Sequence, residues 1–211
     1  MIVDPVILLA FLPAALALNL TPGADMMFCL GQGLRAGPRA AVAASAGIAL
    51  GGVFHAAIAG LGLSALIAAM PGALDVIRWI GVAYLLYLAV QALRSAPVTT
   101  AMARQVQPRA AHRAFLQGLV VNLTNPKVIL FVLAFVPQFV DPSRGAVPGQ
   151  FLIYGVVLSL GGFAVNGAVG VFAAGAAGRM AGNLHLARLL GWISAGIFTA
   201  LALRLALVQK G

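Results

Sequence analysis

Six long apolar stretches follow one another along the 211-residue chain, with short polar or turn-forming segments between them. They cover residues 5–33, 40–69, 75–94, 114–139, 149–177 and 187–208. An α-helix needs about 20 mainly apolar residues to cross the hydrocarbon core of a bilayer, and each stretch has that length. The pattern predicts an all-α polytopic membrane protein with six transmembrane helices, forming a single transmembrane domain over residues 1–211 without a soluble domain.

The composition supports a membrane protein and affects how the positive net charge is interpreted. Hydrophobic residues make up 62% of the chain and charged residues only 8%, and the mean hydropathy is +1.04. Such a chain has too few polar residues to cover a water-soluble domain. The net charge of +9 would suit a nucleic-acid binder, but the arginines lie at the ends of the apolar stretches. We therefore expect membrane lipid, and no nucleic acid, as a partner; the formation of a homo-oligomer is left open.

The arginines are distributed unevenly between alternate loops. The loops after the first, third and fifth stretches contain Arg35, Arg39, Arg94, Arg104, Arg109, Arg113, Arg179 and Arg188. The loops after the second and fourth stretches contain only Arg78 and Arg144, each with an aspartate nearby. Because Lys and Arg concentrate in cytoplasmic loops, we predict both termini outside and the basic loop 95–113 in the cytoplasm. Lys210 at the C-terminus opposes this orientation.

Two polar breaks that contain proline interrupt the first and fourth apolar stretches. They read Asn19-Leu20-Thr21-Pro22-Gly23-Ala24-Asp25 and Asn122-Leu123-Thr124-Asn125-Pro126-Lys127. Proline inside a helix removes a backbone hydrogen bond, and at bilayer depth the freed carbonyl must find a partner or line a cavity. The same break in both halves predicts two inverted three-helix repeats, about 1–95 and 113–211, joined by the basic loop. Such repeats place a transport site near the midplane, between the halves.

Each break contains one charge, Asp25 in the first and Lys127 in the second. Both lie at least ten residues from the nearest loop marker, which places them inside the hydrocarbon if the helix rises about 1.5 Å per residue. A charge at that depth costs about 2.5 kcal/mol or more, so it normally faces a partner or water. We expect Asp25 and Lys127 to pair. Either the pair only fixes how the halves dock, or Asp25 carries a proton or substrate ammonium while Lys127 neutralises it or attracts a carboxylate.

The uncharged residues of the breaks are candidates for the same site. Their side chains can bond the backbone groups freed by the prolines, or offer the same groups to a ligand. Asn166, in the middle of the fifth stretch, is a further candidate, whereas Gln138 is expected at an interface and His55 as a hydrogen-bonding group between helices. The predicted substrate-binding and proton-binding residues are Asn19, Thr21, Pro22, Gly23, Asp25, Asn122, Thr124, Asn125, Pro126, Lys127 and Asn166.

No motif for enzymatic chemistry or for a cofactor occurs in the chain. The three histidines are scattered, Cys29 is the single cysteine, and glutamate is absent. Neither a metal-ligand cluster nor a phosphate-binding glycine motif can be recognised. We therefore expect no enzyme, no cofactor and no bound metal. Without a site for ATP, uphill transport would use an ion gradient, and Asp25 is the only deep carboxylate that could carry its proton.

These motifs resemble the LysE/RhtB amino-acid exporter family. The resemblance rests on the two breaks, the central basic loop, and Phe131 with the run Phe135-Val136-Pro137-Gln138-Phe139, and it extends over nearly the whole chain. It implies an exporter of amino acids or their derivatives, such as threonine, homoserine, lysine or leucine, in the bacterial inner membrane and driven by the proton gradient. Ala24 stands where many members have a second proline, so the resemblance does not identify a particular substrate.

Three other classes of function are consistent with parts of the pattern. A cation or metal-ion transporter or channel on a related inverted-repeat scaffold would also use a midplane aspartate, but it would usually need more acidic or carbonyl ligands. A membrane electron carrier would need paired cysteines, and the chain has only Cys29. A scaffold protein without transport would leave the polar breaks without an evident purpose.

Overall fold

The computed structural model describes residues 2–69, 73–94, 107–173 and 184–207, and all regular structure in these ranges is helical. The predicted loop arginines Arg104 and Arg179, the turn at 70–72 and Lys210 lie outside the described residues, as does most of the loop 95–113. The elements are α1 (Pro5–Leu20), α2 (Ala24–Ala36), α3 (Pro38–Ala69), α4 (Ala73–Arg94), α6 (Ala111–Leu123), α7 (Pro126–Ala134), α8 (Val147–Val171) and α10 (Leu184–Leu207), with 3-10 turns η1 (Val136–Phe139) and η2 (Pro142–Arg144).

The helices follow the predicted apolar stretches, and both predicted breaks are present. Four described helices, α3, α4, α8 and α10, are each long and apolar enough to cross a membrane. The chain bends by 55° between α1 and α2, and by 54° between α6 and the helical segment that begins at Pro126. Counting each bent pair as one span gives six spans. Each half then has the same order, one broken helix followed by two straight ones.

One predicted helix end was wrong. The fifth stretch was expected to remain helical to residue 177, but α8 ends at Val171. Phe172 leaves the helical conformation with φ −90° and ψ 8°, and the amide of Ala173 bonds the carbonyl of Gly170 in a tighter turn. The glycines and alanines that follow Phe172 favour close packing, but they do not themselves specify where a helix ends.

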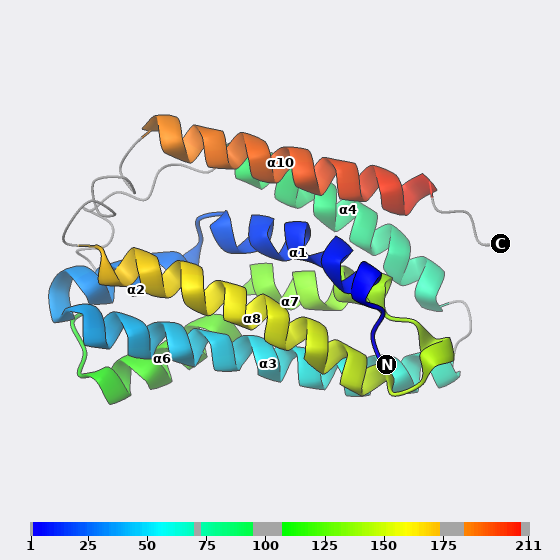
Figure 1. Cartoon of the computed structure of the whole chain (residues 1–211), viewed down its shortest axis with the longest axis horizontal. Coiled ribbons are helices and arrows are strands. Elements are labelled where there is room, and N and C mark those ends of the chain that lie inside the picture. The colour runs from blue at the N-terminus through cyan, green and yellow to red at the C-terminus, as the bar shows by residue number, and fades with distance from the viewer. Residues whose placement is uncertain (1, 70–72, 95–106, 174–183, 208–211) are drawn as a thin grey trace.

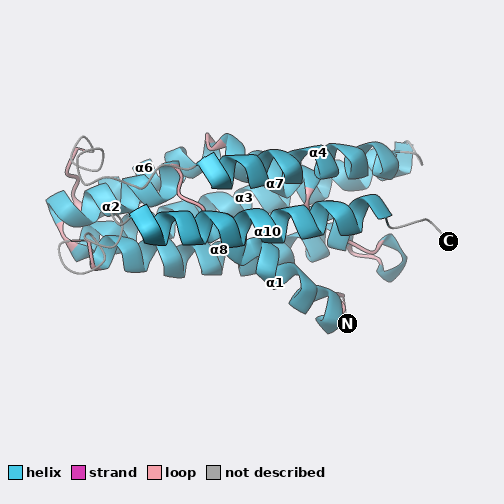
Figure 2. Cartoon of the chain, turned by 90° about the horizontal axis from the view of Figure 1, so that it is seen from above, coloured by secondary structure: helices cyan, strands magenta, loops and turns pink. Residues whose placement is uncertain are grey.

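The long helices run nearly alongside one another in an elongated bundle (Figures 1 and 2). α4 and α10 lie together on one side, α3 packs against α6 and α8 on the other, and α1 contacts both α8 and α10. Glycines bring α3 and α6 together. A Cβ atom at Gly118 would overlap the carbonyl oxygen of Ala44, and one at Gly47 would overlap that of Phe115. Small residues at these crossings let the backbones approach closely, as in other membrane bundles.

Buried aromatic rings fill the bundle beside α1. Phe11 is fully buried and contacts the rings of Phe131, Phe135, Phe139 and Tyr154, with centroids 5.0 to 6.4 Å apart. The hydroxyl of Tyr154 donates to the carbonyl of Phe139 at 2.8 Å, so its polar end is satisfied. This aromatic cluster joins α1, α7, η1 and α8 between the breaks and the end of the bundle at which α1 begins.

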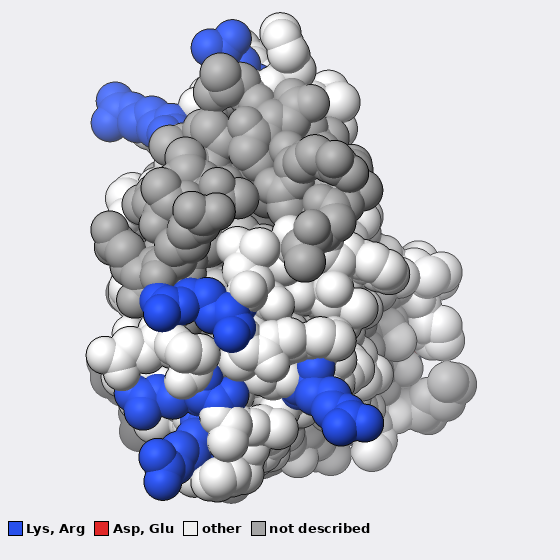
Figure 3. All heavy atoms as spheres, turned by 90° about the vertical axis from the view of Figure 1, so that its left-hand side faces the viewer, with Lys and Arg blue, Asp and Glu red and all other residues white. Residues whose placement is uncertain are grey.

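The two ends of the bundle differ in charge. Figure 3 shows Lys and Arg side chains gathered on one end, with no acidic side chain of the described residues in view. α2 and α4 end there, with Arg35 and Arg94 in their last turns, and α3, α6 and α10 begin there. α1 begins and α10 ends at the opposite end (Figure 1), where Arg144 pairs with Asp4 at 2.9 Å. This difference between the ends agrees with the predicted concentration of arginines in alternate loops. Which end faces the cytoplasm stays a prediction.

Candidate functional site

The first break is formed by a helix end and a helix start that are connected by three residues. α1 ends at Leu20, where the amide and the hydroxyl of Thr21 both bond the carbonyl of Ala17, at 3.0 and 2.7 Å. Gly23 is extended, and α2 starts at Ala24 with Asp25 in its first turn. The partial positive charge of a helix N-terminus favours a carboxylate at that position. Thr21 therefore repairs the end of α1, while the start of α2 presents Asp25.

The second break is built in a similar way from α6 and α7. The amide and hydroxyl of Thr124 bond the carbonyl of Val120, at 3.0 and 2.9 Å. The side chain of Asn125 caps α7, accepting from the amide of Lys127 at 3.0 Å. Asn125 is buried, whereas Thr124 and Pro126 are exposed. Thr124 thus completes the helix end, and the two residues that turn inward from this break are Asn125 and Lys127.

The carboxylate of Asp25 is bound by two amides of the second break. The Nδ2 atom of Asn122 donates to one carboxylate oxygen at 2.9 Å, and that of Asn125 donates to the other at 3.0 Å. Asn122 and Asn125 are both buried. Hydrogen bonds from neutral amides stabilise the charged carboxylate without adding a charge.

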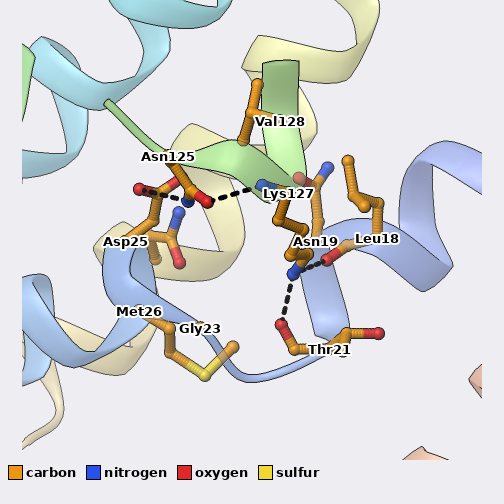
Figure 4. Close-up of a pocket in the computed structure, with 10 residues that line it drawn as sticks. Leu18, Asn19, Thr21, Gly23, Asp25, Met26, Asn125, Lys127 and Val128 are labelled. Carbon is orange, nitrogen blue, oxygen red and sulfur yellow. Dashed lines mark hydrogen bonds between the residues drawn. The ribbon is translucent and has the colours of Figure 1, made fainter. Parts of the chain in front are cut away.

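Lys127 binds the backbone of the first break. Its Nζ atom donates to the carbonyls of Leu18 and Thr21, each at 2.7 Å (Figure 4). The carbonyl of Leu18 would accept from residue 22 in a continuous helix, but Pro22 has no N–H group. Lys127 therefore supplies the hydrogen bond that Pro22 removes. The donors between the two breaks thus all come from the second break, since it also supplies the amides that bind Asp25.

The predicted direct pair between Asp25 and Lys127 is not formed. No oxygen of Asp25 lies within 4.0 Å of Nζ of Lys127, although both residues line one pocket. At the first break, the ammonium group of Lys127 donates short hydrogen bonds to two backbone carbonyls. The carboxylate of Asp25 accepts hydrogen bonds from two asparagine amides. Each charge is satisfied by neutral groups of the other half.

A third contact lies at the second proline. Pro126 has no N–H group to donate to the carbonyl of Asn122, and this oxygen accepts from the amide of Asn125 at 2.9 Å instead. The Nε2 atom of His55 on α3 lies 3.2 Å from the same oxygen. A carbonyl only accepts, so Nε2 carries the proton in this contact. The expectation that His55 is a hydrogen-bonding group between helices is confirmed, and His55 is a second donor to this carbonyl.

The pocket between the breaks is small and mostly polar (Figure 4). Its cavity measures about 30 Å³. A water molecule needs roughly 10–15 Å³ of such space, so one or two waters fit and an amino acid does not. The pocket is therefore too small, in this conformation, to contain a bound amino acid. The pocket is lined by Leu18, Asn19, Thr21, Gly23, Asp25, Met26, Asn125, Lys127, Val128 and Asn166.

The structure brings most of the predicted site residues together. Asn166 of α8 is buried at the pocket, and Nδ2 of Asn19 donates to the carbonyl of Leu158 at 3.1 Å, which connects α1 to α8. Pro22 and Pro126 shape the breaks but do not line the pocket, and Thr124 lies outside it. Asn122 contacts the site through Asp25 and faces a second cavity.

Two polar residues near the site were not among those predicted from the sequence. The hydroxyl of Tyr84 on α4 donates to the carbonyl of Lys127 at 2.8 Å, and Ser159 of α8 lines the second cavity beside Asp25. Ser159 lies seven residues before Asn166, which is two helical turns and places both on one face of α8. That spacing was the available signal. A lone serine between two leucines gives little reason to look for it.

Together, the fold and the site define a helical membrane protein with a small polar pocket between two broken helices. The model of the LysE type translocator family matches residues 16–209, nearly the whole chain. The chain belongs to this family. It is 38% identical to an uncharacterised membrane protein of Vibrio cholerae over 149 residues, which cover 70% of this chain and 71% of that protein.

Two further relatives have functional names. The chain is 36% identical to the homoserine/homoserine lactone efflux protein of Salmonella typhimurium, with 70% of each chain covered. It is 31% identical to a leucine efflux protein of an Enterobacter species, with 71% of each chain covered. No solved structure is significantly similar to the chain.

Proposed function

We propose that this protein is a secondary active exporter of amino acids or amino-acid derivatives in the bacterial inner membrane, driven by the proton gradient. The proposal rests on how the two halves hold the charges of the site, around a small polar pocket. Asp25 is bound by two asparagine amides of the second half, and Lys127 is bound by two backbone carbonyls of the first half. A carboxylate and an ammonium group, each held by neutral partners, can exchange those partners for the two ends of a zwitterion. The names of the related efflux proteins support this substrate class.

The chemistry of the named substrates favours particular roles for the two charges. Homoserine, its lactone and leucine all have an α-ammonium group, but in the lactone the carboxyl group is closed into an ester. A site that accepts all three must therefore recognise the ammonium group. We assign this group to Asp25, and the carboxylate, where the substrate has one, to Lys127. Asn19, Asn125 and Asn166 complete the polar lining of the pocket.

The two breaks also provide a route to alternating access. If the halves are inverted repeats, rocking one half against the other opens the pocket toward one end of the bundle at a time. The aromatic cluster around Phe11 closes the path toward the end where α1 begins, which the distribution of arginines assigns to the outside. Export then requires these rings to separate after the substrate has entered from the basic, cytoplasmic end.

Proton coupling is assigned to Asp25. Among the described residues it is the only carboxylate that lines the pocket. Protonation from the outside would weaken the hold of Asp25 on the substrate ammonium, and release of the proton to the cytoplasm would restore it. Proton entry and substrate exit would then alternate at one group, which is the requirement for exchange transport.

The test is uptake into inside-out membrane vesicles that contain the overproduced protein. With the interior acidified, we expect labelled homoserine, homoserine lactone or leucine to accumulate, and we expect a protonophore to abolish the accumulation. Vesicles from the same strain without the protein are the control. Accumulation of a metal ion or another inorganic cation, with none of the three compounds moved, would contradict the proposal and favour a cation transporter.

A further inference from the structure

A second cavity lies beside Asp25, on the side away from Lys127. It also measures about 30 Å³, and it shares Leu18, Asn19, Asp25, Val128 and Asn166 with the first cavity. Its remaining lining comes from α3, α6 and α8 and includes the side chains of Asn122 and Ser159. Asp25 therefore lines two small spaces of different chemistry, one that Lys127 also lines and one that Asn122 and Ser159 line instead.

Two buried oxygen atoms on this second cavity have no hydrogen-bond partner among the described residues. They are Oδ1 of Asn122 and Oγ of Ser159, in side chains that are 3% and 7% exposed. The amide of Asn122 must turn its nitrogen to Asp25, because a carboxylate only accepts, and this leaves the oxygen directed elsewhere. Buried polar atoms are nearly always bonded in proteins, so two on one cavity indicate that something else binds there.

Glycines of α3 leave the room for these oxygens. A Cβ atom at Gly51 would lie 2.7 Å from Oδ1 of Asn122, and one at Gly52 would overlap Oγ of Ser159. Any larger residue at Gly52 would push the hydroxyl from its place. The close approach of α3 therefore serves the polar cavity as well as helix packing.

We infer that this cavity binds the ammonium group of the transported substrate. The inference rests on the proposed export of amino acids and adds Ser159 and Asn122 to the groups that select the substrate. A primary ammonium group has three N–H donors, and the cavity offers the Asp25 carboxylate, Oδ1 of Asn122 and Oγ of Ser159 as acceptors. The Lys127 ammonium repels a cation from the first cavity and leaves that space for a carboxylate. The substrate is thereby oriented with its two ends on either side of Asp25.

The test uses two analogues of leucine that each keep one end. Leucinamide keeps the ammonium group and lacks the carboxylate, whereas 2-hydroxy-4-methylpentanoate keeps the carboxylate and has a hydroxyl in place of the ammonium. Binding of each to the purified full-length protein is measured by ligand-induced thermal stabilisation. In Ser159→Ala we expect the Kd for leucinamide to rise about tenfold, since a hydrogen bond to a charged group is lost, with the Kd for the hydroxy acid unchanged.

The matched control is Ser45→Ala. Ser45 is also a buried serine, but its hydroxyl donates to the carbonyl of Phe163 at 2.9 Å, away from both cavities. We expect this variant to bind both analogues like the wild type. The inference is overturned if Ser159→Ala binds leucinamide normally, or if it weakens both analogues equally, as a general loss of structure would.

A sodium ion is the other small cation that such oxygens could hold. If Ser159→Ala changed the dependence of transport on sodium, tested by replacement with choline, while leucinamide bound normally, the cavity would be an ion site and the inference would be wrong. The vesicle assay separates this from the proposed function. Absence of all amino-acid transport by the wild type would remove the export proposal, whereas leucinamide binding reports on the cavity directly.

Discussion

The Nζ atom of Lys127 lies 2.7 Å from the carbonyl oxygen of Leu18, which is the oxygen that Pro22 leaves without a donor. A residue of the second break thus completes the first. Asn122 and Asn125 of the second break likewise hold the carboxylate of Asp25. The first break therefore depends on side chains of the second half, and we expect substitutions in either break to affect the site.

Replacing Lys127 tests the first of these contacts. Lys127→Met leaves the carbonyls of Leu18 and Thr21 without their donor, so we expect the free energy of unfolding to fall by about 1 to 3 kcal/mol and transport to be lost. Thermal unfolding in detergent and vesicle uptake measure the two effects. Full stability of the variant would show that Lys127 does not hold the first break together.

Asp25→Asn tests proton coupling. The variant keeps the size of the side chain but removes the charge and the titration, so we expect gradient-driven uptake to fall by about tenfold or more. The control is Asp4→Asn, at a partly buried carboxylate that pairs with Arg144 at the end of the bundle, far along α1 from the break. Equal gradient-driven uptake by Asp25→Asn and Asp4→Asn would exclude Asp25 as the proton carrier.

His55→Leu tests the repair of the second proline. It removes one of two donors to the carbonyl of Asn122, the other being the amide of Asn125, and we expect a loss of about 0.6 kcal/mol in stability, the average for a hydrogen bond between membrane helices. His112→Leu, at an exposed position near the start of α6, should leave stability within about 0.5 kcal/mol of the wild type. Chemical or thermal unfolding compares the two. Equal stability of both variants would contradict the role assigned to His55.

Gly118→Ala tests the close packing of α3 and α6, on which the position of Asn122 depends. The new methyl group would overlap the carbonyl of Ala44, so we expect destabilisation by about 1 to 3 kcal/mol. Gly62→Ala is the matched control, because nothing lies within 4 Å of its added Cβ atom. Alanine in a helix is favoured over glycine by about 0.5 to 1 kcal/mol, so the control should be slightly stabilised. If both variants unfolded alike, the contact would not restrict the packing.

Much of the fold was predictable from the sequence, because membrane helices satisfy their own backbone and so follow apolar length closely. The breaks were predictable for the same reason, since Pro22 and Pro126 remove specific backbone bonds. The end of α8 at Val171 was not, because the apolar residues continue past it and no proline or polar cluster marks the end.

The site was predictable in its residues more than in its bonds. The expectation that Asp25 and Lys127 lie together rested on their depth and on each break having one charge, and both line one pocket. Their partners did not follow, because a deep charge can be satisfied by a carbonyl or an amide as well as by an opposite charge. Ser159 was missed because its significance depends on Gly52 of α3, and the sequence does not show which helix faces α8 at that point.

The hydrogen bonds between the two breaks also affect how the halves can move when no substrate is bound. Moving the halves apart strips Asp25 and Lys127 of their partners at the same moment, and both charges would then be exposed without compensation in a medium of low dielectric constant. A ligand with only a cationic or only an anionic group provides a new partner for only one of these two charges. If the protein is the proton-coupled exporter proposed above, the same contacts that hold the helices in place would suppress idle cycling, in which protons cross without cargo and dissipate the gradient.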